Sequence, residues 1–151
     1  MEIERKFLVK KLPDRLKDFP SCEIEQAYLN RRPVLRIRKA DTRYILTMKG
    51  DGVLAHEEYE LLMDEESYRH LLTKADGRII TKRRYKIPYQ GYTIELDIFS
   101  GCMEGLVLAE VEFPSVEEAE SFTPPAWFHK DVTSDPRYRN AVMAYGGTDP
   151  A

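Results

Sequence analysis

Pairs of like-signed charged residues, each separated by one residue, recur along the chain and constrain its fold more than any other feature. The first instance is Glu2-x-Glu4-x-Lys6. Strand side chains alternate between two faces, so these three charges share one face while Ile3 and Phe7 occupy the other. Further pairs are Arg36/Arg38, Glu58/Glu60, Lys82/Arg84, Glu95/Asp97 and Glu110/Glu112, most of them with apolar neighbours. The pattern therefore predicts strands with one charged and one apolar face.

Each pair taken alone fits a strand whose charged face meets solvent. The signs, however, are sorted by strand, with acid pairs on some strands and base pairs on others. A face that only needed to be wet would mix Thr, Ser, Gln, Lys and Glu freely. Sorting by sign indicates that the charged faces look at each other across an interior. Because buried charge without a partner is costly, that interior is predicted to hold a ligand that needs both signs, such as a polyphosphate with its metal.

Length and composition favour one domain covering 1–151, with a hydrophobic content of 42% and a charged content of 32%. The formal net charge of -3 provides no global basic field for nucleic acid, so no nucleic-acid partner is expected. No apolar run has the length of a membrane span, so no membrane partner is expected either. Cys22 and Cys102 lie far apart without a C-x-x-C motif, which favours free thiols and a cytoplasmic location.

The order of apolar patterns and turn residues predicts eight strands and a few helices. Asp64 is expected to cap a helix from 65 to 74, and Ser115 with Glu118 forms a capping box for a helix that ends near 122. Asp135-Pro136 is expected to open a last helix with Ala141, Val142 and Tyr145 as its apolar stripe. The strands are expected at 2–9, 22–29, 34–39, 44–49, 54–62, 78–87, 92–99 and 106–113, with a tight turn at 50–52. The predicted fold class is α+β, a closed eight-stranded antiparallel β-barrel with helices packed on the outside.

The inward charges suggest a specific chemistry. Two carboxylates about 4 Å apart repel by roughly 4 kcal/mol at an effective dielectric of 20, so a cluster of them takes up protons or recruits a divalent cation. The three histidines, His56, His70 and His129, lack zinc spacing and are expected to be surface or packing residues, so oxygen ligands would favour Mg²⁺ or Mn²⁺. The cations predicted to hold phosphate oxygens are Lys6, Arg36, Arg38, Lys49, Lys82, Arg84 and Lys130.

Neither a Ser-His-Asp arrangement nor a P-loop glycine pattern is present, so the predicted nucleophile is water. Tyr28 is a candidate general base if Lys6 lies beside it, because a nearby ammonium favours the phenolate. The alternative for Tyr28 is an aromatic residue at the edge of the core whose hydroxyl is hydrogen-bonded.

The ordered set of motifs resembles the CYTH superfamily, the triphosphate tunnel metalloenzymes, over nearly the whole chain. Besides E-x-E-x-K, R-x-R and K-x-R, it includes the runs 95–101 and 109–113, K-D-V-T at 130 and R-Y-x-N at 137. The resemblance implies an eight-stranded tunnel with Mg²⁺ or Mn²⁺ on Glu2, Glu4, Glu110 and Glu112. It also implies that Glu58, Glu60 and Asp97 support a second metal or the attacking water. His56 departs from the pattern, because arginine is expected two residues before Glu58.

The resemblance implies hydrolysis of a small-molecule substrate, inorganic triphosphate, to pyrophosphate and phosphate by in-line attack of water. The alternatives within the enzymes are a class IV-type adenylate cyclase and a thiamine triphosphatase. A module that binds polyphosphate or a nucleotide without catalysis, or a barrel with merely solvated charges, is the alternative outside them. The expected assembly is a monomer or a homodimer.

Overall fold

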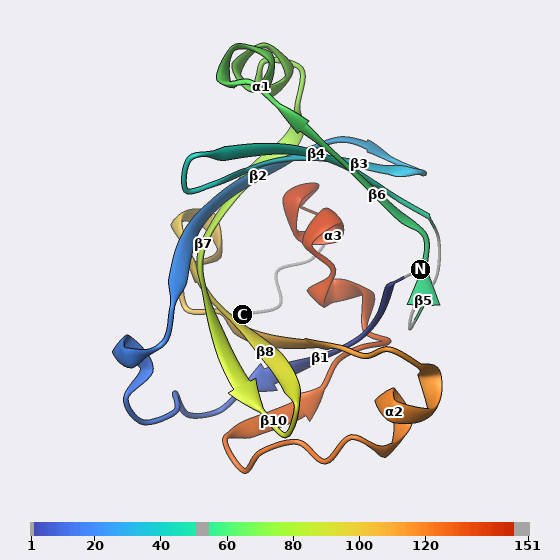
Figure 1. The fold of residues 1–151 in the computed structure, drawn as a ribbon. Helices are drawn as coiled ribbons and strands as arrows, with labels where there is room; N and C mark the ends of the chain where they lie inside the picture. Colours follow the sequence, from blue (N-terminus) through green and yellow to red (C-terminus); the bar gives the residue numbers. More distant parts are fainter. Residues whose placement is uncertain (1, 51–54, 147–151) are drawn as a thin grey trace.

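A ten-stranded antiparallel sheet makes up most of the fold and curls around an interior (Figure 1). The computed structural model describes residues 2–50 and 55–146. The strands are β1 (Glu2–Val9), β2 (Ser21–Arg31), β3 (Val34–Ala40), β4 (Arg43–Lys49), β5 (Ala55–His56), β6 (Glu58–Met63), β7 (Asp76–Tyr89), β8 (Tyr92–Ser100), β9 (Val107–Glu112) and β10 (Phe128–Asp131). All of their pairings are antiparallel, as predicted.

The strand register brings the charged pairs of neighbouring strands together. The order is β10-β1-β9-β8-β7-β2-β3-β4-β6. On β1 and β9, Glu4 lies opposite Glu112 and Lys6 lies opposite Glu110. Residues directly opposite each other project from the same face of a sheet, so the sorted charges meet across the strands. This register places the charged faces of β1 and β9 on the inside of the curled sheet, where they line one cavity.

The prediction of a closed eight-stranded barrel is wrong in strand number, since the described sheet has ten strands. The sheet is also not closed, because its two end strands, β10 and β6, do not pair with each other. The strand predicted at 54–62 is divided at Glu57, because β6 pairs with β4 while β5 leaves it to pair with β1. That second pairing consists of Glu2 with His56 and Ile3 with Ala55. Strand β10, which also pairs with β1, was not predicted from the sequence. The turn predicted at 50–52 lies mostly outside the described residues.

Two helices cover outer apolar faces of the sheet, as predicted. Helix α1 (Glu65–Leu72) begins at Asp64, whose Oδ1 accepts a hydrogen bond from the Ser67 amide at 2.7 Å. Its Tyr68 is buried against Ala27 and Ile37. Helix α2 (Val116–Ser121) begins at Ser115, whose Oγ accepts from the Glu118 amide at 3.2 Å, and it covers the cluster around Phe7 and Phe113. Among the described residues, no helix has the length and apolarity needed to cross a membrane.

Helix α3 (Asn140–Ala144) lies inside the curled sheet, so the prediction that all helices pack outside is wrong (Figure 1). A separate 3₁₀ turn (Pro136–Tyr138) precedes it, where the sequence predicted one continuous helix. Met143 and Ala144 are its fully buried residues, while Ala141, Val142 and Tyr145 line the cavity. Gly77 on β7 permits this packing, since a Cβ there would lie 2.3 Å from the Ala144 carbonyl oxygen. The Arg78 guanidinium donates to the Met143 carbonyl at 2.6 Å and fixes the end of α3.

Candidate active site

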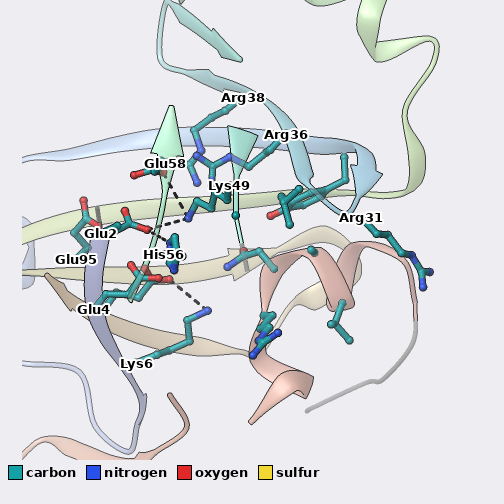
Figure 2. A pocket seen from close by; sticks show the side chains of 18 of the residues that line it. Glu2, Glu4, Lys6, Arg31, Arg36, Arg38, Lys49, His56, Glu58 and Glu95 are labelled. Carbon is teal, nitrogen blue, oxygen red and sulfur yellow. Dashed lines mark hydrogen bonds and ion pairs between the residues drawn. The ribbon is translucent and has the colours of Figure 1, made fainter. Parts of the chain in front are cut away.

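The interior of the sheet holds a cavity of about 560 Å³ whose walls carry both signs of charge. In Figure 2 the carboxylates of Glu2, Glu4 and Glu58 lie toward one side, with Lys49 between them and the guanidinium groups of Arg36 and Arg38. The predicted site residues that line the cavity are Glu2, Glu4, Lys6, Tyr28, Arg36, Arg38, Lys49, Glu58, Glu60, Lys82, Arg84, Glu110 and Glu112. The structure therefore places most of the predicted site on one surface. Two predicted site residues, Asp97 and Lys130, do not line it.

The acidic side is crowded with carboxylates that lack sufficient countercharge. Burial, followed by the charge of Glu110, raises the pKa of Glu4 to about 8. Burial and a hydrogen bond with Glu58 raise the pKa of Glu2 to about 7, although Lys49 lies 3.3 Å from its Oε1 and acts in the opposite direction. A carboxyl whose pKa is raised this far favours its neutral form, so this side has room for added positive charge.

His56 completes a group of possible metal ligands with Glu2 and Glu4, and we call these three residues the Glu2 cluster. One ligand atom from each lies within 4.8 Å of the others. The Nε2 atom of His56 is hydrogen-bonded to Glu2 Oε1, and its ring is 8% exposed. Carboxylate oxygen and imidazole nitrogen are both ligands of divalent cations, so the donor set fits such an ion.

Other acids of the site differ in how far their charge is compensated. Glu110 is ion-paired with Lys6 at 3.5 Å. Burial opposes its charge, but Lys6, Arg84 and Lys82 together hold the pKa of Glu110 well below its usual range. Glu112 is exposed at the cavity, and partial burial with the charge of Glu58 raises its pKa. Glu110 therefore carries a firm negative charge, while Glu112 is easier to protonate.

The basic side has the opposite imbalance. Arg38 donates through Nε and Nη2 to the Gln26 amide oxygen at 2.9 and 2.6 Å, and Arg36 donates to Thr47 at 3.2 Å. The Nε atom of Arg36 is buried without a hydrogen-bond partner among the described residues. Burial, then the charges of Arg36 and Arg84, lower the pKa of Arg38 to about 9. The buried Arg36 and the half-buried Arg38 are held by neutral partners among the described residues, and such guanidinium groups favour the binding of an anion between them.

Asp97 lies in the wall behind the cavity, where it neutralises two of the predicted phosphate-binding cations. Arg84 donates to both of its oxygens at 2.7 and 2.8 Å, and Lys82 Nζ lies 2.8 Å from Oδ2. Asp97 is 1% exposed and Lys82 is 0% exposed, and we call Asp97, Lys82 and Arg84 the Asp97 cluster. Burial acts most strongly on Lys82 and lowers its pKa to about 7 despite Asp97. Both oxygens of Asp97 are thus engaged by cations of the chain itself.

Among the described residues, no hydrogen bond joins the Lys6 ammonium to the Tyr28 hydroxyl, and the role of Tyr28 as a general base stays a prediction. The Lys6 ammonium donates to the Tyr138 carbonyl at 2.8 Å and pairs with Glu110. The Tyr28 side chain is 2% exposed, and its hydroxyl accepts from Gln26 Nε2 at 3.4 Å. Tyr28 lines the cavity as a buried aromatic residue with a hydrogen-bonded hydroxyl, which is the alternative raised from the sequence. Lys130 is exposed on β10, away from the cavity lining.

Several lining or supporting residues were missed from the sequence. Gln26 is fully buried and connects Arg38 to Asn140, whose Oδ1 accepts from Gln26 Nε2 at 3.1 Å and from Lys82 Nζ at 3.3 Å. The signal for Gln26 was its position on the same strand face as Tyr28. Asn140 belongs to the R-Y-x-N segment, but no pattern predicted that this segment would enter the sheet. His56 was expected to be a surface or packing residue.

Comparisons with known proteins show the family of the chain. The sequence model of the CYTH domain matches residues 1–131. The chain belongs to the CYTH family. It is 41% identical to the inorganic triphosphatase of Nitrosomonas europaea over 149 residues, which cover 95% of this chain and 96% of that protein. It is 37% identical to the inorganic triphosphatase of Acetivibrio thermocellus, covering 94% and 92%.

Solved structures of other proteins have a similar fold. A crystal structure described as an inorganic triphosphatase superposes with a TM-score of 0.73 and 38% identity, covering 96% of this chain and 95% of that one. A protein from Pyrococcus horikoshii has a TM-score of 0.62 at 25% identity, covering 80% and 84%. The first of these covers nearly the full length of both chains, so the similarity includes the strands that line the cavity.

Proposed function

We propose that this CYTH enzyme hydrolyses inorganic triphosphate to pyrophosphate and phosphate in the charged cavity. Relatives that share about two-fifths of its residues over nearly the full length carry the name inorganic triphosphatase. The observation that carries the proposal within the cavity is the pair of Arg36, which is buried, and Arg38, which is half-buried. The pair lacks a carboxylate partner among the described residues and faces a crowded acidic side. A chain of phosphates bound with a divalent cation satisfies both imbalances.

The acidic side fits a divalent cation, because burial and the neighbouring acids Glu58 and Glu110 raise the pKa values of Glu2 and Glu4, and a bound cation would favour their charged forms. We propose Glu2, Glu4, Glu110 and Glu112 as the residues that hold it, and Mg²⁺ or Mn²⁺ as the ion. A bound cation of this kind supplies positive charge that offsets the negative charge of the transferred phosphoryl group. Glu58 and Glu60, predicted to support a second ion or the attacking water, line the same cavity and keep that proposed role.

The chain's own residues position the substrate. Arg36 and Arg38 provide guanidinium forks for phosphate oxygens, and Lys49 lies between them and the acids as a point charge (Figure 2). Lys6 and Arg84 add positive charge, but each already has a carboxylate partner, Glu110 and Asp97 respectively. Water attacks the terminal phosphorus, the P–O bond to the middle phosphate breaks, and pyrophosphate leaves with the bridging oxygen. Preorganised charge of this kind accelerates phosphoryl transfer to water without a covalent intermediate between enzyme and substrate.

Phosphate release from a panel of substrates tests the proposal. Tripolyphosphate, ATP and thiamine triphosphate are assayed side by side, with Mg²⁺, with Mn²⁺ and with chelator. Rapid release from tripolyphosphate that chelator abolishes is the expected result. Cyclic AMP as the main product from ATP would identify a cyclase instead, and tight tripolyphosphate binding without phosphate release would identify a binding module. Arg38→Ala is expected to raise KM more than it lowers kcat.

Location and assembly stay predictions of the sequence. We propose a cytoplasmic enzyme that acts as a monomer or a homodimer on a small-molecule substrate. Light scattering of the purified protein across a concentration series distinguishes the two assemblies.

A further inference from the structure

We infer that His56 is a metal ligand of this chain, so that the Glu2 cluster binds first-row transition-metal cations such as Mn²⁺, Co²⁺ and Zn²⁺ in preference to Mg²⁺. The inference rests on the proposed metal site but goes beyond it, because it changes the donor set from oxygen alone to oxygen and nitrogen. It predicts which ion the acidic side selects.

The position of His56 supports this assignment. It lies on the two-residue strand β5, which leaves the course of β6 and pairs with the first residues of β1. This pairing sets His56 directly opposite Glu2 and aims its Nε2 atom at a Glu2 carboxylate oxygen. Figure 2 places the ring between the carboxylates of Glu2 and Glu4, within the cavity. With 8% exposure, the ring has little freedom to turn away.

The chemistry of the three side chains matches a transition-metal site. Two carboxylates and one imidazole offer ligand atoms within 4.8 Å of one another, a spacing that a single ion can bridge. Mg²⁺ strongly prefers oxygen ligands, whereas imidazole nitrogen suits later first-row cations, whose affinities rise from Mn²⁺ through Co²⁺. His56 therefore extends the donor set of the acidic side from oxygen alone to oxygen and nitrogen.

The competing explanation is that His56 only orients Glu2 through a hydrogen bond. A positioning residue would affect all divalent cations alike, because it acts through the same carboxylate whichever ion is bound. A ligand would affect nitrogen-preferring cations far more than Mg²⁺. Selectivity between ions, rather than affinity for one ion, therefore separates the two explanations.

NMR of the full-length wild-type protein labelled with ¹⁵N-histidine tests the inference without a variant. The chain has three histidines, and His70 and His129 are exposed on other elements. One equivalent of Zn²⁺, added to metal-free protein without substrate, is expected to shift a ring nitrogen of His56 and to leave the other two unchanged. An unchanged His56 nitrogen, a shift only at His70 or His129, or no Zn²⁺ binding would each overturn the inference.

Calorimetric titrations of His56→Gln provide the selectivity measurement. Glutamine keeps a side-chain N–H donor for Glu2 but removes the imidazole. Affinity for Zn²⁺ and Co²⁺ is expected to fall by about 10–100-fold, the range found when groups that support a metal site are removed, while Mg²⁺ affinity changes little. His129→Gln is the matched control and should change neither. An equal loss for all three ions would assign His56 to orientation of Glu2.

These outcomes are separate from those of the hydrolysis assay. Hydrolysis with Mg²⁺ on the carboxylates alone would uphold the proposed function even if the His56 signal does not move. Conversely, a shifted His56 nitrogen in a protein that releases no phosphate would uphold the metal site and reject the hydrolase.

Discussion

The Asp97 cluster and the Glu2 cluster are both groups of buried charge at one cavity, but they are balanced in different ways. In the Asp97 cluster, one carboxylate accepts from Arg84 and pairs with Lys82, so the protein supplies its own countercharge. In the Glu2 cluster, Glu2 is paired with Lys49 and hydrogen-bonded to the ring of His56, and Lys49 is also paired with Glu58. The pKa of Asp97 is lowered because its two cations outweigh burial, whereas burial raises the pKa of Glu2 and Glu4.

This difference in charge balance distinguishes residues that stabilise the wall of the cavity from residues that are suited to bind a ligand. A buried charge that is fully paired contributes to the integrity of the wall, and removing one partner leaves the others uncompensated. A buried charge that is not paired costs stability in the free protein and recovers it when a ligand of opposite charge binds. The two clusters are therefore expected to respond in opposite directions to loss of a carboxylate charge.

The largest expected effect is that of Asp97→Asn on stability. The substitution removes the anion that Lys82 and Arg84 share and leaves Arg84 with Glu95, 3.4 Å away, as its remaining carboxylate partner. Removing one partner of a buried ion pair typically costs about 3–5 kcal/mol. Urea denaturation followed by circular dichroism measures the loss. Asp18→Asn is the matched control, since it removes an aspartate from a surface ion pair with Arg15, and its midpoint should barely move. Equal midpoints for wild type and Asp97→Asn would show that the Asp97 cluster does not stabilise the wall.

Glu4→Gln is expected to have the opposite effect on stability while reducing hydrolysis by at least about 100-fold, since metal binding loses a charged ligand. The pKa of Glu4 is about 8 in the folded protein and near 4.5 in the unfolded chain. The folded state therefore binds more protons between these values, and wild-type stability falls as pH rises through that window. Without metal, the stability advantage of Glu4→Gln over wild type should grow from pH 5 to pH 8.

Thermal denaturation of both proteins with chelator, at pH 5, 6.5 and 8, measures this trend. The difference in stability between the two proteins is the quantity to follow. The lowered pKa values of His56 and Lys82 make stability rise with pH, opposite to the effect of Glu4, but both groups are present in wild type and variant alike. Saturating divalent cation should abolish the advantage or reverse it. A constant difference across pH would mean that Glu4 ionises normally.

Gln26→Leu is expected to have a smaller effect, confined mainly to substrate binding. Gln26 accepts two hydrogen bonds from Arg38 and donates one to Asn140, so leucine frees the guanidinium from its fixed orientation. Hydrogen bonds to charged groups are typically worth about 1.5–3 kcal/mol, which predicts a rise in KM of about tenfold or more. Steady-state kinetics with tripolyphosphate separate KM from kcat. A fall in kcat at constant KM would place Gln26 in the chemical step instead.

Much of the sheet could be predicted from the sequence, because alternation and turn residues act locally. The strands at β1, β3 and β8 and the caps at Asp64 and Ser115 follow from patterns of a few residues. The division between β5 and β6 could not be predicted, since it arises from pairing with two different strands. The position of α3 inside the curled sheet was also not predicted, because it depends on contacts with Gly77 and Arg78, which are far away in the sequence.

For the site, the sorted signs predicted which strand faces turn inward, but they could not predict which charges pair with each other. Glu95 and Asp97 belong to one motif, yet Glu95 lines the cavity while Asp97 lies behind it with Lys82 and Arg84. Neutral residues carried no such signal. Gln26 and Asn140 become meaningful only when the fold brings them between Arg38 and Lys82.

Lys130→Ala is expected to have the smallest effect and tests the one predicted phosphate-binding residue that the structure leaves outside the cavity. Lys130 is exposed on β10, and its charge interacts with that of Asp135. An exposed charge beyond the cavity is screened by salt and contributes little to binding. KM and kcat for tripolyphosphate should stay close to wild type, whereas Lys49→Ala, which removes a cation between the two sides of the cavity, should raise KM clearly. A large rise in KM for Lys130→Ala would mean that the C-terminal segment closes over the bound substrate and brings this lysine to it.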